Sequence, residues 1–572
     1  MDKERQAVIV GVGRYTQDKN LVIEQCKTPQ GMYAEAAKIA AHDTGVANPD
    51  QLLKDVVCLG APGMFLEMRW RGVYGGKPFV NYTRSVANEI GANPEDKFCV
   101  RSEHGGNGPQ YMMSTFSEMI ANGTMPQGPV LVGGTEVNGS FDRATRSGKK
   151  DVLLDLGWGN NPNNNPKTGP KIINQHPKPE DKDPRENDVT LSQFHHIAGN
   201  SSGGMALYIY PLFENAYAHS LGRTADEHLP YICDLFSRFS VVAASQPQHS
   251  WYPTEKTKEF LMTPSKDNRI IGYPYRKWLC ARDEIDMSSC AILMSWAEAE
   301  RRGISEDKLV FIHGSGDGFD ANSLALRHHL HKSDSMQVAY NEAFRSAGLG
   351  DVPDQSKIAV FDFYSCFPIA VEQACKCVGL HPNKDDVSRM TATGGLPYHG
   401  GPGSNYSGHG LCAIVEKLRT NSFRGKFGCV GANGGWLTEH SVGIYSTNPP
   451  AKTYSRRHYD DYQGDYQMPF DQIAYKPTGT GEILTWTVRY GRQGAETAVI
   501  VGQMVDGPDK GKRFIANSKP GDMALNNWLL SGDRIGDTVA ISPGGEIPFG
   551  RRGNRKVDQI YAELNGGGNA RL

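Results

Sequence analysis

The strongest constraint on the fold is a pattern that occurs twice along the chain. Short runs of β-branched and aliphatic residues alternate with helical stretches. Residues 7–12 form a buried-strand pattern, and residues 32–44 form an alanine-rich helical pattern that ends at a glycine. A similar order begins near residue 280, where residues 290–294 and 309–312 flank a helical pattern. This alternation predicts a layered α/β architecture made of two similar halves.

The chain changes character after residue 447. Two adjacent prolines and a stretch rich in tyrosine and aspartate mark a linker, residues 451–471. Short strand patterns follow over residues 472–565, and they predict a small all-β barrel, most simply an OB-fold. The boundaries expected for the α/β part are 1–278 for its N-terminal half and 279–450 for its C-terminal half.

One segment of the N-terminal half fits neither sheet. Residues 157–187 contain six prolines among asparagines and charged residues. This composition predicts an excursion over the surface, within a long loop region that spans about residues 142–275. Loops of this length serve as lids, as partner contacts or as partly disordered segments, and the composition fits all three.

Charge and composition exclude several classes of partner. The 572 residues include 61 basic and 63 acidic side chains, so the net charge of −2 gives no field to hold nucleic acid. No apolar run approaches the roughly 20 residues of a membrane helix. The 11 cysteines lack paired spacing, which indicates a reducing compartment. We expect a cytoplasmic protein, or a peroxisomal one in a eukaryote, because the chain ends in Ala570-Arg571-Leu572.

No metal site and no bound cofactor are predicted. His328 and His331 have helical spacing, but no group of Cys, Asp or Glu accompanies them, so a solvated helix face is expected. Residues 11–13 read Gly-Val-Gly after a strand, yet the third glycine of a dinucleotide-binding turn is missing.

Four segments, taken in order, resemble the thiolase superfamily. The first, residues 105–110, reads Gly-Gly-Asn-Gly-Pro-Gln where the family has Cys-Gly-Ser-Gly-x-Gln, so Gly105 stands at the position of the nucleophilic cysteine. The resemblance covers roughly residues 5–447. It implies a duplicated αβαβα layered fold, and it is closest to thiolase-like proteins with a fused C-terminal OB domain.

The other three segments keep part of the family's motifs. Residues 364–367, Tyr-Ser-Cys-Phe, resemble the His-Asp-Cys-Phe of the sterol-carrier-type thiolases. Residues 400–402, Gly-Gly-Pro, replace Gly-His-Pro, whose histidine activates the nucleophile, although His399 and His409 flank them. Residues 429–431, Cys-Val-Gly, keep the Cys-x-Gly whose cysteine moves the α-proton of the incoming acetyl group.

The resemblance and the flanking residues give two sets of candidates. The candidate catalytic residues are Cys366, Cys429, Tyr364, His104, His399 and His409. The candidates for the oxyanion and substrate contacts are Gly105, Gly106, Asn107, Gly108, Asn405 and Asn433.

Three functions fit these residues, each with a coenzyme A thioester as the ligand. The protein is similar to acetyl-CoA acetyltransferases, with Cys366 or Cys429 as a relocated nucleophile and one of the histidines as base. It also resembles the thiolase-fold aldolases of steroid side-chain breakdown, which use tyrosine and work with an OB-domain partner. Tyr364 and the fused barrel fit such a retro-aldol lyase. As a third alternative, the thiolase core is a non-catalytic acyl-CoA-binding or scaffold module. The resemblance also implies a homodimer or a larger homo-oligomer.

Overall fold

The computed structural model describes residues 2–75, 79, 81–103, 105–159, 171–173, 206–321, 324–464, 468–549 and 555–565. Three features expected from the sequence lie outside these residues: His104, nearly all of the proline-rich segment, and the C-terminal Ala570-Arg571-Leu572. Among the helices that are described, none combines the length and the apolar character that a membrane crossing requires.

The α/β part is built on one mixed sheet of ten strands, in the order β10-β11-β12-β9-β1-β8-β4-β2-β3-β5. These strands are β1 (Ala7–Thr16), β2 (Cys58–Pro62), β3 (Cys99–Ser102), β4 (Val130–Val137), β5 (Lys171–Ile173), β8 (Asp286–Ser295), β9 (Val310–Phe319), β10 (Ile358–Phe363), β11 (Phe427–Gly434) and β12 (Glu439–Ser446).

The same strand pairing occurs in both halves. In the N-terminal half β2 and β4 are parallel, and β8 is antiparallel to both β4 and β1. Because β8 spans Asp286–Ser295, this half extends beyond residue 278, where the sequence placed its end. In the C-terminal half β10 and β11 are parallel, and β12 is antiparallel to both β11 and β9. A short antiparallel contact between β1 and β9 joins the halves. The duplicated α/β fold predicted from the sequence is therefore confirmed.

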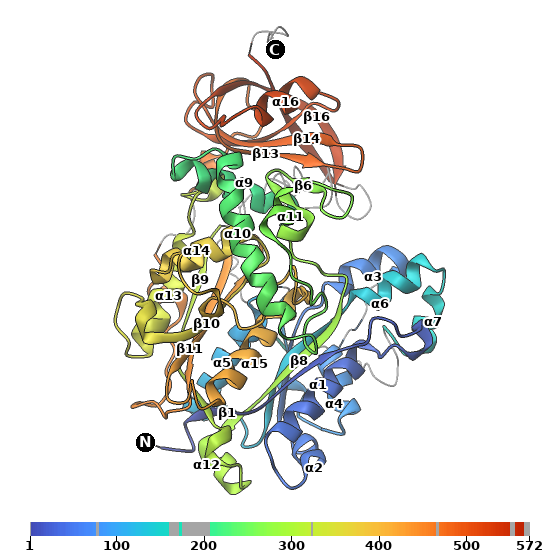
Figure 1. The fold of residues 1–572 in the computed structure, drawn as a ribbon, viewed down its shortest axis with the longest axis vertical. Helices are drawn as coiled ribbons and strands as arrows, with labels where there is room; N and C mark the ends of the chain where they lie inside the picture. The colour runs from blue at the N-terminus through green and yellow to red at the C-terminus, as the bar shows by residue number, and fades with distance from the viewer. Residues whose placement is uncertain are drawn as a thin grey trace.

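Helices cover the sheet in layers. The helices of the two halves are α1 (Pro29–Asp43), α2 (Pro49–Lys54), α3 (Leu66–Tyr74), α4 (Tyr82–Glu89), α5 (Gly108–Asn122), α6 (Asn138–Arg146), α7 (Lys150–Asp155), α12 (Trp296–Arg301), α13 (Asp334–Ser346), α14 (Pro368–Val378) and α15 (Tyr406–Arg419). Helices α5 and α15 contact each other, and both share one apolar core with strands of both halves, so they form the middle layer (Figure 1).

Glycines in two equivalent strands bring the outer helices close to the sheet. A side chain on Gly11 of β1 would begin 2.2 Å from the carbonyl oxygen of Ala40 in α1. A side chain on Gly316 of β9 would begin 2.1 Å from the carbonyl oxygen of Ala339 in α13. The glycines of residues 11–13 therefore serve helix packing, which agrees with the rejection of a dinucleotide-binding turn.

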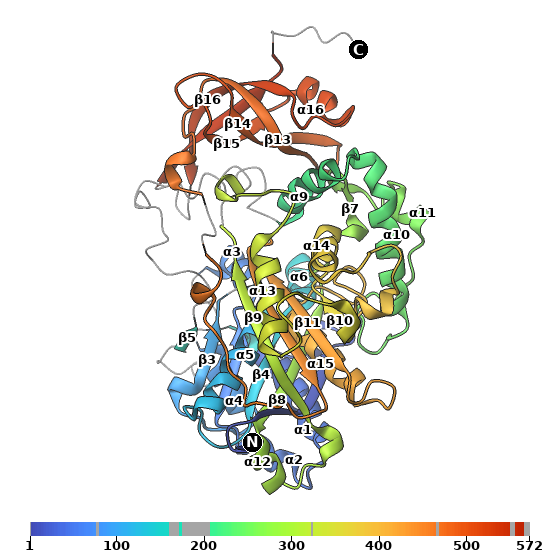
Figure 2. The same cartoon turned by 90° about the vertical axis from the view of Figure 1, so that its left-hand side faces the viewer.

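The long excursion of the N-terminal half contains helices of its own. After the undescribed segment the chain forms α9 (Ala206–Ser220), α10 (Ala225–Ala244) and α11 (Lys258–Met262), then the short strands β6 (Ile270–Gly272) and β7 (Tyr275–Arg276). Helix α9 and strands β6 and β7 lie between the α/β part and the C-terminal domain, and α10 runs down along the α/β part beside α14 (Figures 1 and 2).

The C-terminal domain is a small closed barrel with one helix. Its elements are β13 (Gly479–Tyr490), β14 (Ala495–Met504), β15 (Arg513–Ser518), α16 (Met523–Leu530), β16 (Thr538–Phe549) and β17 (Arg555–Glu563). Strand β13 pairs with both β14 and β16, and β15 pairs with β17 in parallel, which closes the ring. This topology is consistent with the OB-like domain expected from the sequence.

Helix α9 attaches the barrel to the rest of the protein. The Asn215 side-chain amide donates to the carbonyl oxygen of Trp486 over 2.7 Å. The Thr487 hydroxyl donates to the carbonyl oxygen of Tyr273 over 2.8 Å. Strand β6 also pairs with β13. The excursion therefore joins the barrel to the α/β part through buried polar contacts.

Candidate active site

The turn of residues 105–108 connects β3 to the start of α5. The Gly105 amide donates to the Ser404 hydroxyl oxygen over 3.2 Å, and the Gly108 amide donates to the Gly105 carbonyl oxygen over 3.0 Å. The turn therefore uses two of its own amides to hold its shape. The amides of Gly106 and Asn107 are left as the candidates for a thioester oxygen, beside the positive end of the α5 dipole.

Tyr364 packs directly on this turn. It follows β10, and its hydroxyl oxygen lies 2.2 Å from the place where a side-chain carbon on Gly106 would begin. The Tyr364 hydroxyl donates to the carbonyl oxygen of Gly403 over 3.2 Å. Burial raises the pKa of Tyr364 well above its ordinary value, so the phenol is neutral at physiological pH. Residue 106 must be glycine while Tyr364 occupies this position.

Cys366 lies on the same side of the site and contacts two polar side chains. Its Sγ atom is 3.7 Å from the Asn433 amide nitrogen, and it shares a hydrogen bond with the Tyr210 hydroxyl. Asn433 lies near the end of β11, which is parallel to β10, so the carboxyl ends of both strands meet here.

The thiol of Cys366 is neutral at physiological pH. Burial raises its pKa to about 12, although hydrogen bonds from Tyr210, Asn433 and the Phe367 amide favour the thiolate. Cys366 stands two residues before α14, where the helix dipole also favours a negative charge. Because burial outweighs all of these contributions, the residue is a poor nucleophile.

Two asparagines bring further polar groups to this region. The side-chain amide of Asn107 donates to the Ser441 hydroxyl oxygen over 3.3 Å. The Oδ1 atom of Asn107 is 2.4 Å from the point where a side chain on Gly434 would begin. Within the described part of the chain, Asn107 Oδ1 and Asn433 Oδ1 are buried acceptors without a hydrogen-bond partner. A donor group of a ligand can satisfy such acceptors.

Glu136, at the end of β4, fixes the loop that accepts the Tyr364 hydrogen bond. Its carboxylate accepts the amides of Phe65 over 2.7 Å and of Leu66 over 3.2 Å. Its Oε1 atom is 2.4 Å from where a side chain on Gly403 would begin. Burial raises the pKa of Glu136 to about 8.

Tyr210 is a residue of the site that the sequence did not identify. It comes from α9 in the excursion, and its hydroxyl oxygen accepts the Asn433 amide over 2.8 Å and the Leu437 backbone amide over 3.1 Å. Its ring stacks on Phe367 with the centroids 4.3 Å apart. None of the four segments that carry the resemblance includes α9, so no sequence signal pointed to this residue.

Two of the remaining candidates are fixed within the protein. Asn405 donates to the Gly134 carbonyl oxygen over 2.7 Å and accepts the Ser289 hydroxyl over 3.3 Å, so its side chain ties the loop to β4 and β8. Cys429 lies in the middle of β11 and is fully buried in an apolar core, and burial raises the pKa of its thiol. Neither arrangement points to catalysis.

His399 and His409 form a buried pair of their own. His399 Nε2 is 3.4 Å from His409 Nδ1, and both side chains are fully buried. Burial lowers the pKa of both imidazoles well below the ordinary value. The ring of Tyr406 contacts both Tyr364 and His399, with centroid distances of 5.1 and 6.1 Å, and so stands between this pair and Tyr364.

Comparisons with known proteins agree with this description. Residues 466–546 match the family model described as the thiolase-like protein type 1 additional C-terminal domain. No curated protein matches the chain. A monomeric SCP2-thiolase-like protein type 1 from Mycobacterium smegmatis is similar in structure, with a TM-score of 0.73, 29% identity, and coverage of 98% of this chain and 99% of that chain.

More distant solved structures share the α/β part. The Ltp2-ChsH2(DUF35) aldolase has a TM-score of 0.50 and 17% identity, over 77% of this chain and 97% of that chain. The human mitochondrial 3-ketoacyl-CoA thiolase in complex with CoA has a TM-score of 0.50 and 14% identity, over 78% of this chain and 98% of that chain. With the duplicated fold, these similarities show that the chain has a thiolase-like fold, followed by a C-terminal domain of the kind described for the thiolase-like protein type 1.

Proposed function

We propose that this protein binds a β-hydroxyacyl-CoA at the turn of residues 105–108 and cleaves it by a retro-aldol reaction, without forming an acyl-enzyme. The observation that carries the proposal is the position of the Tyr364 hydroxyl directly over Gly106, at the turn that would hold the thioester. A coenzyme A thioester as the ligand is supported by the human mitochondrial 3-ketoacyl-CoA thiolase, which has a similar fold and is solved in complex with CoA.

The reaction needs one proton shuttle and one electron sink. The Cα–Cβ bond breaks, and its electron pair moves into the thioester, which develops enolate character. In the same step the neutral Tyr364 hydroxyl gives its proton to Cα, and its oxygen takes the proton of the β-hydroxyl group, so the tyrosine is regenerated. The products are a shortened acyl-CoA and a ketone or aldehyde.

Other groups of the site support the enolate and the tyrosine. Backbone amides of the turn can donate to the thioester oxygen, whose negative charge increases during the reaction. Glu136 accepts a hydrogen bond from the backbone of Ser404 and so holds the adjacent Gly403, which accepts the Tyr364 hydrogen bond. One relative with the same fold is named as an aldolase, which agrees with this chemistry.

Acyl transfer through a relocated nucleophile is the second candidate. Cys366 favours it, because this thiol lies at the site with hydrogen bonds from Tyr210 and Asn433. Its raised pKa weighs against it, and the hydrogen bonds of the thiol come from Tyr210, Asn433 and the Phe367 amide rather than from a histidine. Cys429 is weaker still, because it lies in an apolar core.

The variants Tyr364→Phe and Cys366→Ser separate these functions. Chromatography of the CoA products from a series of β-hydroxyacyl-CoAs measures kcat/KM. Retro-aldol cleavage predicts that Tyr364→Phe lowers kcat/KM by about 10²–10⁴-fold, whereas Cys366→Ser has a small effect. The reverse pattern supports acyl transfer. Binding of acyl-CoA without turnover by the wild-type protein supports the non-catalytic alternative.

The homodimer implied by the thiolase resemblance stays a prediction. The SCP2-thiolase-like relative is named as monomeric, and that description belongs to that protein. Light scattering of the purified full-length chain distinguishes a mass of one chain from a mass of two.

A further inference from the structure

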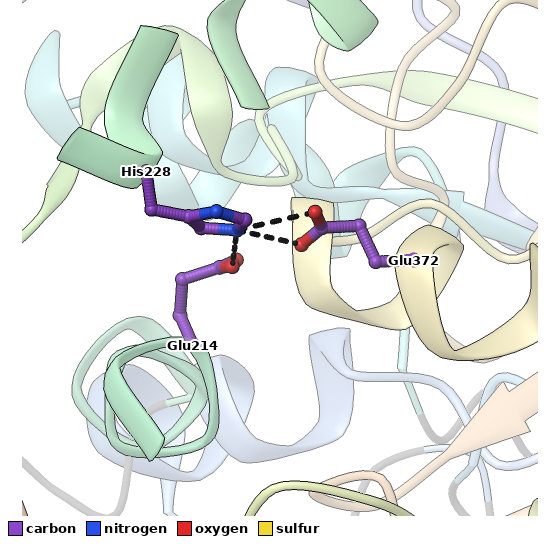
Figure 3. Close-up of side chains that lie close together, drawn as sticks. All are labelled: Glu214, His228 and Glu372. Atoms are coloured by element: carbon purple, nitrogen blue, oxygen red, sulfur yellow. Dashed lines mark hydrogen bonds and ion pairs between the residues drawn. The ribbon is translucent and has the colours of Figure 1, made fainter. Parts of the chain in front are cut away.

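Three buried side chains from three helices meet outside the candidate active site. Glu214 comes from α9, His228 from α10 and Glu372 from α14. Their relative exposures are 0%, 1% and 3%, so the group is shielded from solvent. The ligand atoms of all three lie within 4.8 Å of one another. Figure 3 shows the imidazole of His228 facing both carboxylates.

His228 Nε2 has more close carboxylate contacts than one hydrogen bond explains. His228 Nε2 is 3.1 Å from Glu214 Oε1, and it is 3.1 and 3.4 Å from the two oxygens of Glu372. One ring nitrogen carries at most one hydrogen, yet three carboxylate oxygens surround this atom. Groups bound about 2.1 Å from a metal ion stand about 3.0–3.4 Å apart, which matches the observed spacing.

We propose that Glu214, His228 and Glu372 form a binding site for a divalent transition-metal ion. Two carboxylates and one imidazole suit Zn²⁺, Mn²⁺ or Fe²⁺, and the imidazole disfavours Mg²⁺ and Ca²⁺. Two buried carboxylates need a compensating positive charge. A protonated His228 supplies one unit of charge, and a divalent ion in place of that proton would supply two.

The surroundings of the three ligands support this assignment. The Tyr275 hydroxyl donates to Glu214 Oε2 over 2.5 Å, which leaves Oε1 directed at His228. Such outer hydrogen bonds orient carboxylate ligands in metal sites. The guanidinium of Arg223 lies on the other side of the ring, with Nη1 3.4 Å from His228 Nδ1. A histidine that binds a metal through Nε2 carries its proton on Nδ1, so metal binding would require the Arg223 guanidinium to turn away from that atom.

The site has a structural role next to the candidate active site. Glu214 lies one helical turn after Tyr210 on α9, and Glu372 lies on the helix that follows Cys366. Because the group is closed to solvent, the ion is expected to hold α9 and α14 together rather than to bind substrate. It would thereby fix the positions of Tyr210 and Cys366.

Metal analysis of the purified full-length protein tests the proposal. The wild-type chain should contain about one transition-metal ion after dialysis without chelator, as measured by inductively coupled plasma mass spectrometry. His228→Gln and the double variant E214Q/E372Q should contain none above background. Glu342→Gln is the matched control, because Glu342 is also buried, at 4% exposure, but lies outside the group. Tyr275→Phe should keep the ligands and weaken the affinity by about 10–100-fold.

Reconstitution gives a second readout that does not depend on variants. The chelator-treated wild-type protein should gain thermal stability with ZnSO4 or MnCl2. With Co²⁺ it should show visible d–d bands without the thiolate charge-transfer band that a cysteine site gives. A wild-type protein without metal that is not stabilised by these salts overturns the proposal, and the group is then a network that shares protons. Equal metal content in the wild-type protein and in folded ligand variants also overturns it.

Discussion

Asn433 at the end of β11 donates a hydrogen bond of 2.8 Å to the Tyr210 hydroxyl of α9, 223 residues earlier in the chain. Both side chains also contact Cys366. The excursion that carries the C-terminal barrel therefore supplies a polar group to the candidate active site. This contact makes the thiol of Cys366 a reporter of the position of α9.

Tyr210→Phe should make Cys366 less reactive. The variant loses one hydrogen bond to the thiolate, so the pKa of Cys366 rises further and alkylation slows by about tenfold. Peptide mapping by mass spectrometry after timed reaction with iodoacetamide measures this rate. Tyr217→Phe is the matched control, since Tyr217 is on the same helix and is packed near Glu372 instead. Equal rates in the wild-type protein and in Tyr210→Phe would show that α9 does not support the site.

The pH dependence of the same reaction tests the state of Cys366. A pKa of about 12 means that the thiolate fraction is small at neutral pH and grows with every pH unit. Alkylation should therefore rise about tenfold per unit between about pH 7 and 10 without a plateau, whereas an ordinary thiol levels off above about pH 9. A plateau near pH 8 would support an activated nucleophile and the acyltransferase alternative.

Gly106 and Tyr364 should behave as a coupled pair in stability. Gly106→Ala places a carbon 2.2 Å from the Tyr364 hydroxyl oxygen and should lower the free energy of unfolding by about 1–3 kcal/mol. In the background of Tyr364→Ala the same change should cost much less, because the space is open. Gly72→Ala in α3 is the control, since no atom lies within 4 Å of the added carbon. Additive effects in denaturant unfolding would mean that the two residues do not touch.

Glu136 should make the protein less stable as the pH rises. Burial raises its pKa to about 8 in the folded state, whereas the unfolded carboxyl titrates near 4.5. Between these values the folded state holds one more proton, so the free energy of unfolding falls with pH, by a total on the order of 5 kcal/mol. Glu136→Gln should remove most of this slope between about pH 5 and 8.

The control for the Glu136 experiment is an exposed glutamate. Glu306→Gln, in the short turn before β9, should leave the slope unchanged. Denaturant unfolding at several pH values measures each slope. Parallel curves for the wild-type protein and Glu136→Gln would show that the carboxyl is ionised in the folded protein at neutral pH.

The sequence predicted the α/β halves because strand and helix periodicity is a local property. The sequence named the turn of residues 105–108 and Tyr364 because their segments keep the order of the thiolase motifs, and the structure brings them into contact. The three-letter pattern at Cys429 was less informative. Strand β11 continues to Gly434, and side chains alternate along it, so Asn433 shares the face of Cys429 but lies about 13 Å further along. Asn433 therefore reaches Cys366 because it lies near the C-terminal end of β11, whereas Cys429 lies in the middle of the strand.

Residues that depend on tertiary packing were not predictable. His399 and His409 flank the Gly-Gly-Pro segment in sequence, but the start of α15 at Tyr406 puts His409 against His399 and not against Tyr364. The proposed metal ligands Glu214, His228 and Glu372 have no motif spacing, because 144 residues separate His228 from Glu372. Only the packing of α9, α10 and α14 brings them together.

The most direct test of the central claim is the intact mass of the protein during turnover of a β-hydroxyacyl-CoA, with the products identified in the same samples. The account predicts an unmodified protein mass, a shortened acyl-CoA and a ketone or aldehyde from the wild-type chain, and formation of these products about 10²–10⁴-fold more slowly by Tyr364→Phe. An acyl group mapped to Cys366, together with products that Tyr364→Phe still forms, would contradict the account.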